Sequence, residues 1–243
     1  MKKTLPFLFL LSLAIFIVSC SKDKTPPADV PAPGPVLSTS LAGFGTYGGT
    51  PSGTAFVLPS NVKLVGSILG GDPGKSPFIG KKTYQAWENF IANSPKSNWV
   101  THGLGVFVNL YMKLYNTSSS PTTFVFPAGL VFCNKSVDDS TVIDTTQTGI
   151  IIIPDTVTIP GGDTLDLILK SFCSNSHRGV PGPSSIYISK VVSNNDQLVR
   201  FMAALKGKTT LVNHESDILT YIWQITGGTP LTAADYTIIA SWQ

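Results

Sequence analysis

The chain has 243 residues and a net charge of +3 at neutral pH, and charged side chains make up only 13% of it. Typical domains carry about 25% charged residues, and so small a net charge excludes the strongly basic surface of a nucleic-acid-binding protein. The 22 glycines and 18 prolines, together with abundant Ser and Thr, are typical of an extracellular β-protein with one sizeable core.

The first 19 residues have the pattern of a secretory signal. Lys2 and Lys3 precede an apolar run over residues 5–18, which is too short to span a bilayer and predicts a cleaved segment. Removal of the two lysines would lower the net charge from +3 to +1.

The residues around the expected cleavage point, Ile17-Val18-Ser19-Cys20, resemble the lipobox of bacterial lipoproteins. The resemblance implies cleavage before Cys20 and attachment of lipid to its thiol, which gives the chain a membrane partner. The serine at position 21, where the sorting rule of many Gram-negative bacteria looks for aspartate, implies an outer-membrane lipoprotein, which would allow exposure at the cell surface. The alternative is an ordinary signal followed by an incidental cysteine.

Residues 20–48 are expected to form a tether that lifts a folded domain from the membrane. Five prolines lie between positions 26 and 35, with few apolar side chains among them. Beyond the tether, residues 55–58 favour a strand, and residues 83–93 predict an amphipathic helix that places Tyr84, Trp87, Phe90 and Ile91 on one face.

The middle of the chain has the alternation and spacing of an all-β domain. Residues 106–115 alternate apolar and polar side chains, turn residues follow, and the alternation resumes over residues 123–126, which predicts a hairpin. Further strands are predicted over residues 129–132, 149–153, 156–159, 164–172 and 186–192. We therefore expect an antiparallel β-sandwich over residues 49–192.

The C-terminal residues 193–243 change to a helical period and are expected to form a small α-helical subdomain against the sandwich. The predicted helices run over residues 196–205 and 215–226, and a third begins at the capping box Thr232-Ala233-Ala234-Asp235. They are too short to be stable alone, so the subdomain should depend on packing.

Two segments resemble known families. Residues 116–132 are similar to a strand-turn-strand of immunoglobulin-like domains in bacterial secreted proteins, which implies an immunoglobulin-like sandwich. Residues 221–226 (YIWQIT) resemble the A-I-W-x-x-T helix of thioester-forming bacterial adhesin domains. In that family a glutamine shortly before the tryptophan joins a cysteine, whereas Leu219 and Thr220 hold those places here and Gln224 follows Trp223.

With Cys20 used for lipid, two cysteines remain, Cys133 and Cys173. In an oxidising compartment a disulfide between them is the expected pairing, and it would contribute about 3–4 kcal/mol. No tryptophan lies between them, so the pair does not have the antibody-domain pattern. The alternative is a Cys173 thiolate nucleophile with His177 as its base, because both lie in one polar segment.

Other chemical signals are weaker than the cysteines. The pattern gives no metal or cofactor site, because close-spaced ligand pairs and phosphate-binding glycine loops are missing; Asp138, Asp139 and Asp144 fit a solvated turn better than a calcium loop. Four aromatic residues near predicted loops are candidates for stacking on a glycan or anchoring a protein, although covering the core edge is the commoner role: Tyr47, Trp99, Tyr187 and Trp242.

The sequence thus predicts a lipid-anchored envelope protein that binds a protein or glycan, or takes part in adhesion or envelope assembly, without catalysis. An envelope enzyme or thioester adhesin that uses Cys173 with His177 is the alternative.

Overall fold

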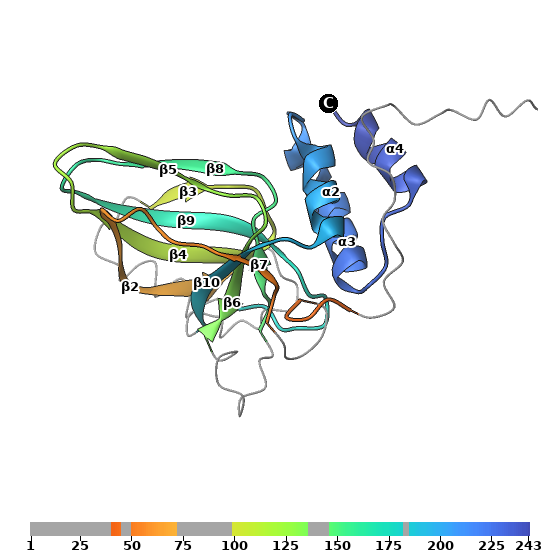
Figure 1. Ribbon diagram of the computed structural model, residues 1–243, viewed down its shortest axis with the longest axis horizontal. Coiled ribbons are helices and arrows are strands. Elements are labelled where there is room, and N and C mark those ends of the chain that lie inside the picture. The colour runs from red at the N-terminus through yellow and green to blue at the C-terminus, as the bar shows by residue number, and fades with distance from the viewer. Residues whose placement is uncertain (1–39, 45–49, 72–98, 136–145, 182–184) are drawn as a thin grey trace, which may run out of the picture.

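The computed structural model describes residues 40–44, 50–71, 99–135, 146–181 and 185–243 (Figure 1). Several features expected from the sequence lie outside these ranges. They are the signal with its lipobox, most of the tether, the helix over residues 83–93, the acidic turn at Asp138 and the aromatic residue Tyr47.

The described part is mainly β, with antiparallel pairing throughout the main sheet except for one short parallel strand, as predicted for the fold class. The strands are β1 (Gly53–Ala55), β2 (Val62–Gly71), β3 (Val100–His102), β4 (Phe107–Asn116), β5 (Thr122–Phe126), β6 (Leu130–Asn134), β7 (Gly149–Ile150), β8 (Asp155–Ile159), β9 (Thr164–Cys173) and β10 (Ile186–Ser193). Most of the alternating segments became strands close to their expected bounds, although the segment 149–153 forms only the two residues of β7. The hairpin expected between residues 106–115 and 123–126 is wrong, because β4 pairs with β2 and β9, and β5 pairs with β8 in the separate ribbon.

The main sheet closes on itself, which corrects the expected sandwich. Its strand order is β1-β10-β2-β4-β9-β7-β6, and an additional pairing of β10 with β6 completes a six-stranded barrel. Tyr187 of β10 pairs with Ile68 on one side and with Asn134 on the other. Irregular register in β10, between Ser189 and Val192, accompanies this change of partners, because a bulge bends and twists a strand.

Strand β2 is also interrupted by a bulge. Its register with β4 shifts between Val65 and Leu69, and Gly66 in this interval has a φ of 76°, a conformation that side chains disfavour. Among the described strands, β10 pairs with β2 only near Ile68 and Leu69, so the opposite side of the first half of β2 forms an open edge.

The barrel interior is filled by every second side chain of its long strands. In β4, Val108, Leu110 and Leu114 are fully buried, and their cross-strand partners include Leu169 of β9. Since partners across an antiparallel pair point to the same face, these residues form one continuous core. The period-2 alternation read from the sequence therefore marks the inside of the barrel.

A glycine makes room for the largest interior side chain. A Cβ atom on Gly70 of β2 would lie 2.1 Å from Cε2 of Tyr187 and 3.1 Å from Cβ of Pro181. The Tyr187 ring is 1% exposed, and its hydroxyl donates to the backbone oxygen of Gln147. Gly70 and Tyr187 therefore act together at the point where the barrel closes.

A separate two-stranded ribbon, β5 with β8, packs beside the barrel (Figure 1). Asn116, at the end of β4, is fully buried under the turns that lead into and out of the ribbon. Its side-chain amide lies within hydrogen-bond distance of the carbonyl oxygens of Ser120, Ile159 and Pro160, at 2.9, 3.2 and 3.1 Å, and its Oδ1 accepts from the Ser118 N–H. The ribbon is thus held by a polar group inside the core.

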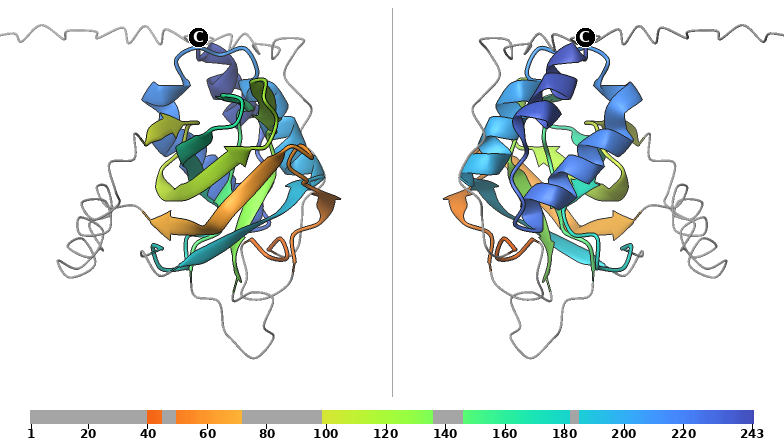
Figure 2. Two further views of the ribbon diagram at one scale, coloured as in Figure 1. Left: turned by 90° about the vertical axis from the view of Figure 1, so that its left-hand side faces the viewer. Right: turned by 90° about the vertical axis from the view of Figure 1, so that its right-hand side faces the viewer.

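Three α-helices cover one end of the barrel, as the two side views show (Figure 2). They are α2 (Asp196–Leu205), α3 (Glu215–Thr226) and α4 (Ala233–Ser241), and a 3₁₀ turn at Leu211–His214 leads into α3. Asn195 caps α2 through its side chain, and Thr232 with Asp235 forms the capping box predicted for α4. No helix in the described part of the chain is long and apolar enough to cross a membrane.

Candidate functional site

Cys133 and Cys173 are both buried, and no disulfide joins them, which corrects the pairing expected from the sequence. The register explains why. Cys173 pairs with Gly149 of β7, and Gly149 pairs in turn with Phe132 of β6, so a whole strand separates the two cysteines. Two strand spacings are roughly 9–10 Å, beyond the Cα separation of about 7 Å that a disulfide allows.

The two thiols also point to opposite faces of the sheet. Cys173 shares a face with its cross-strand neighbours Gly149 and Phe132, and Cys133 is the next residue after Phe132. Successive side chains of a strand alternate faces, so Cys173 points into the barrel and Cys133 points away from its interior. The even number of cysteines could not reveal these opposite orientations, because they depend on the order of the strands in the sheet.

The surroundings of Cys173 do not favour a thiolate nucleophile. Its Sγ donates to the backbone oxygen of Asn175 at 3.2 Å. Burial raises the pKa of the Cys173 thiol to about 11, although the Asn175 hydrogen bond, the Trp223 side chain and the Arg178 charge act in the opposite direction. His177 is exposed on the following turn, whereas a base must lie within reach of a buried thiol.

Replacing Cys173 by alanine should reduce the decrease in the free energy of unfolding that occurs at alkaline pH. The raised pKa means that the folded state holds the thiol proton more tightly than the unfolded state, so this stabilisation is complete below about pH 9 and is lost towards pH 11. We expect the wild type to lose about 2 kcal/mol of unfolding free energy through Cys173 over this interval.

Denaturant unfolding at about pH 8 and about pH 11 measures this effect. Burial also raises the pKa values of Tyr221 and Tyr236, so Cys173→Ala should retain part of the alkaline loss. An identical loss in the wild type and in Cys173→Ala would contradict the assignment.

The segment that resembles a thioester adhesin helix lies in α3, and its glutamine is engaged elsewhere. The Gln224 side-chain amide donates to the backbone oxygen of Pro230 at 3.2 Å. Trp223 instead stacks on Phe107 of β4, with ring centroids 6.5 Å apart, and so packs α3 against the barrel. The tryptophan therefore has a packing role in this fold.

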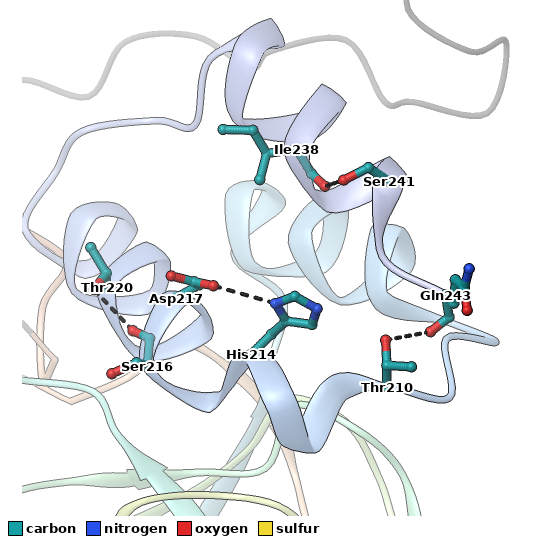
Figure 3. A network of polar contacts seen from close by, with 8 residues as sticks. All are labelled: Thr210, His214, Ser216, Asp217, Thr220, Ile238, Ser241 and Gln243. Atoms are coloured by element: carbon teal, nitrogen blue, oxygen red, sulfur yellow. Dashed lines mark hydrogen bonds and ion pairs between the residues drawn. The ribbon is translucent and has the colours of Figure 1, made fainter.

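A polar network joins α3, α4 and the turn between α2 and α3 (Figure 3). His214 contacts Asp217 at 3.4 Å and stacks on Trp242 with centroids 4.2 Å apart. The Thr210 hydroxyl donates to the Gln243 backbone oxygen at 2.9 Å. The hydroxyls of Thr220 and Ser241 donate to the backbone carbonyls of Ser216 and Ile238 in their own helices, so neither is positioned as a nucleophile beside His214.

The aromatic candidates that the structure describes are largely core residues. Tyr187 and Trp242 are 1% and 7% exposed, and Trp99 packs edge-on against Tyr111 with centroids 5.6 Å apart. The core interpretation is thus confirmed for Tyr187 and Trp242. Within the described ranges, no group of three or more His, Cys, Asp or Glu side chains is arranged to hold a metal ion.

A concave apolar groove of about 480 Å³ lies between α2 and the barrel. One wall is the outer side of α2, with Val199, Met202 and Ala203, and the other is the loop between β7 and β8, with Ile152 and Ile153. Figure 1 shows β10 leading directly into α2 at this place. The volume is in the range of small-molecule sites, which runs from about 300 to 1,000 Å³.

Helix α2 buries one apolar side fully in the core, and a second apolar side next to it lines the groove. Leu198, Phe201 and Leu205 are fully buried, as the helical period predicted. Met202, which the helical period also places on the core face, is half-buried: it packs against the core and also lines the groove, which Val199 lines as well at 45% exposure. The second apolar side is therefore open to the groove.

Two lysines follow α2 at one end of the groove. Lys206 is exposed, and Lys208 is half-buried, with its Nζ donating to the backbone oxygens of Ala240 and Trp242 at 3.3 and 2.8 Å. The residues that line the groove include these two cations and no carboxylate. Sequence reasoning missed this site, although an apolar residue on the expected polar side of the helix, Val199, was its available signal.

Comparisons of the chain with protein-family models, with curated proteins and with solved structures gave no match.

Proposed function

We propose that this chain is a non-catalytic binding protein of the bacterial envelope, held at the membrane by lipid on Cys20, which takes an apolar ligand into the groove between α2 and the barrel. The observation that carries the binding assignment is the open second apolar side of α2. When a ligand covers exposed apolar side chains in a concave site, their surface is removed from water, which is energetically favourable.

The groove has a fixed floor, which favours a preformed site. Ile152 and Leu205 at its base are 1% and 0% exposed, and Leu211 is 6% exposed. Met202 lies over Gly129, where a Cβ atom would approach Met202 Cε to 3.2 Å. Methionine is a flexible, polarisable side chain that adapts to the shape of an apolar ligand.

The anchor follows from the lipobox-like residues and the proline-rich segment after Cys20, which would present the domain at some distance from the bilayer. The enzyme alternative receives little support from Cys173, since its thiol is buried with a raised pKa. A binding role needs only the groove.

Filling the groove should abolish binding of a neutral apolar dye. Ala203 is exposed on the groove wall, so Ala203→Trp places a large ring in the site without disturbing the core. We expect the wild type to raise Nile red fluorescence, and Ala203→Trp to weaken dye binding at least about tenfold, since excluding a few apolar groups costs more than 1.4 kcal/mol.

The matched control is Ala234→Trp, which adds the same ring at an exposed position of α4 and should leave dye binding unchanged. Equal dye binding by Ala203→Trp and the wild type would exclude the groove as the site. The anchor is checked by cell fractionation of the full chain, where Cys20→Ser should move the protein out of the membrane fraction.

A further inference from the structure

We infer that the groove binds a long-chain carboxylate, with its alkyl chain along α2 and its carboxylate at Lys206. This inference rests on the proposed binding function and adds the chemical class of the ligand. Three observations support it: the positive charge at one end of the groove, the apolar side chains of its walls, and the hydrogen-bonded backbone near its base.

The charge at the end of the groove selects an anion. Lys208 donates hydrogen bonds to the Ala240 and Trp242 carbonyls, and its ammonium group places a positive charge beside the site. Lys206 is exposed and makes no ion pair among the residues that the structure describes. With no carboxylate in the lining, an anionic head group meets two positively charged side chains and no negatively charged one.

The walls select an unbranched apolar chain over a peptide. Apart from the two lysines, the only polar side chain of the lining is Ser193, which is 4% exposed and whose Oγ already accepts from the Asn195 N–H. A peptide carries an N–H and a carbonyl at almost every residue, and these groups cost free energy when they are buried without partners. An alkyl chain has no such groups.

The backbone at the base of the groove is also occupied. The Gly129 N–H donates to Ile151 O at 2.6 Å, the Ile151 N–H donates to Leu130 O at 2.9 Å, and the Ser193 N–H donates to Gly129 O at 2.8 Å. A peptide that binds by strand addition needs a free edge of the sheet, and these bonds already occupy the Ser193 N–H and backbone groups beside the lining residues Ala128 and Ile152. The groove therefore offers apolar contact along its length and a charge at its end.

The test compares hexadecanoate with hexadecanol, which has the same chain and no charge, as competitors of Nile red on the purified full chain. We expect hexadecanoate to bind about tenfold more tightly than hexadecanol, the size of effect that one charge-assisted hydrogen bond supplies. Lys206→Glu should remove this preference, because it should weaken hexadecanoate binding much more than hexadecanol binding.

The matched control is Lys63→Glu, which makes the same change of charge on an exposed residue near the end of β4 farthest from the helices. The Lys63→Glu variant should still bind hexadecanoate more tightly than hexadecanol. Equal binding of both competitors to the wild type, or loss of both in Lys206→Glu, would overturn the carboxylate assignment while the groove remains a binding site. Displacement of the dye by an acidic amphipathic peptide and by neither alkyl compound would instead show a protein ligand.

If Nile red binds equally to the wild type and Ala203→Trp, the groove is not the site, and the proposed function fails together with this inference.

Discussion

Replacement of Gly70 by valine should destabilise the protein by about 3 kcal/mol or more, one of the largest effects expected of a single substitution here. The new Cβ atom would lie 2.1 Å from the Tyr187 ring and 3.1 Å from Pro181 Cβ, so β2 and β10 would have to separate. These two strands complete the barrel through few residue pairs, and loss of this contact removes the closure. Urea unfolding followed by circular dichroism measures the change.

Ser67→Val, which introduces valine on the outer side of β2, is the control and should change stability by less than about 0.5 kcal/mol, because Ser67 is exposed. Truncating the ring in the double variant Gly70→Val with Tyr187→Ala should recover part of the loss relative to the sum of the two single changes. Additive effects of the two substitutions would show that the ring contact is not the cause.

Asn116→Leu should cost about 4 kcal/mol. The substitution fills a similar volume but leaves the carbonyl oxygens of Ser120, Ile159 and Pro160 without their donor, and it removes the acceptor of the Ser118 N–H. Each buried polar group left without a partner costs about 1–3 kcal/mol, so the turns that hold the β5–β8 ribbon should loosen first. Thermal unfolding together with amide exchange of the ribbon measures both consequences.

Asn213→Leu provides the control, since Asn213 is exposed and the same change there should be nearly neutral. If Asn116→Leu unfolds within about 1 kcal/mol of the wild type, the buried amide does not hold the ribbon.

The three described helices and most strands were predictable, whereas β2, β3 and the closure of the sheet were not. Alternation in β4 and β9 identified the buried positions because each strand has one face inside the barrel. Closure depends on Tyr187 of β10 pairing with both β2 and β6, which are far apart in the sequence. Nothing in the local pattern of residues 186–192 distinguishes a strand with these partners from one in a sandwich.

The cysteine prediction failed for the same reason, since it used the number of cysteines and not their places in the sheet. Asn116 begins the run of turn residues that follows residues 106–115, and the burial of its amide depends on the ribbon that folds over it. The groove was hidden because Met202 fits the helical period of the core face, and only the packing of α2 shows that its side chain lines the groove as well as contacting the core.

The bulge in β2 has a consequence for self-association. The first half of β2 is the longest open edge among the described strands of the barrel, and its Leu64 and Val65 are 38% and 45% exposed, a combination that invites another chain to add a strand. The charge of Lys63 and the left-handed backbone of Gly66 both oppose such an addition. These two residues would therefore keep neighbouring copies of the chain from joining edge to edge.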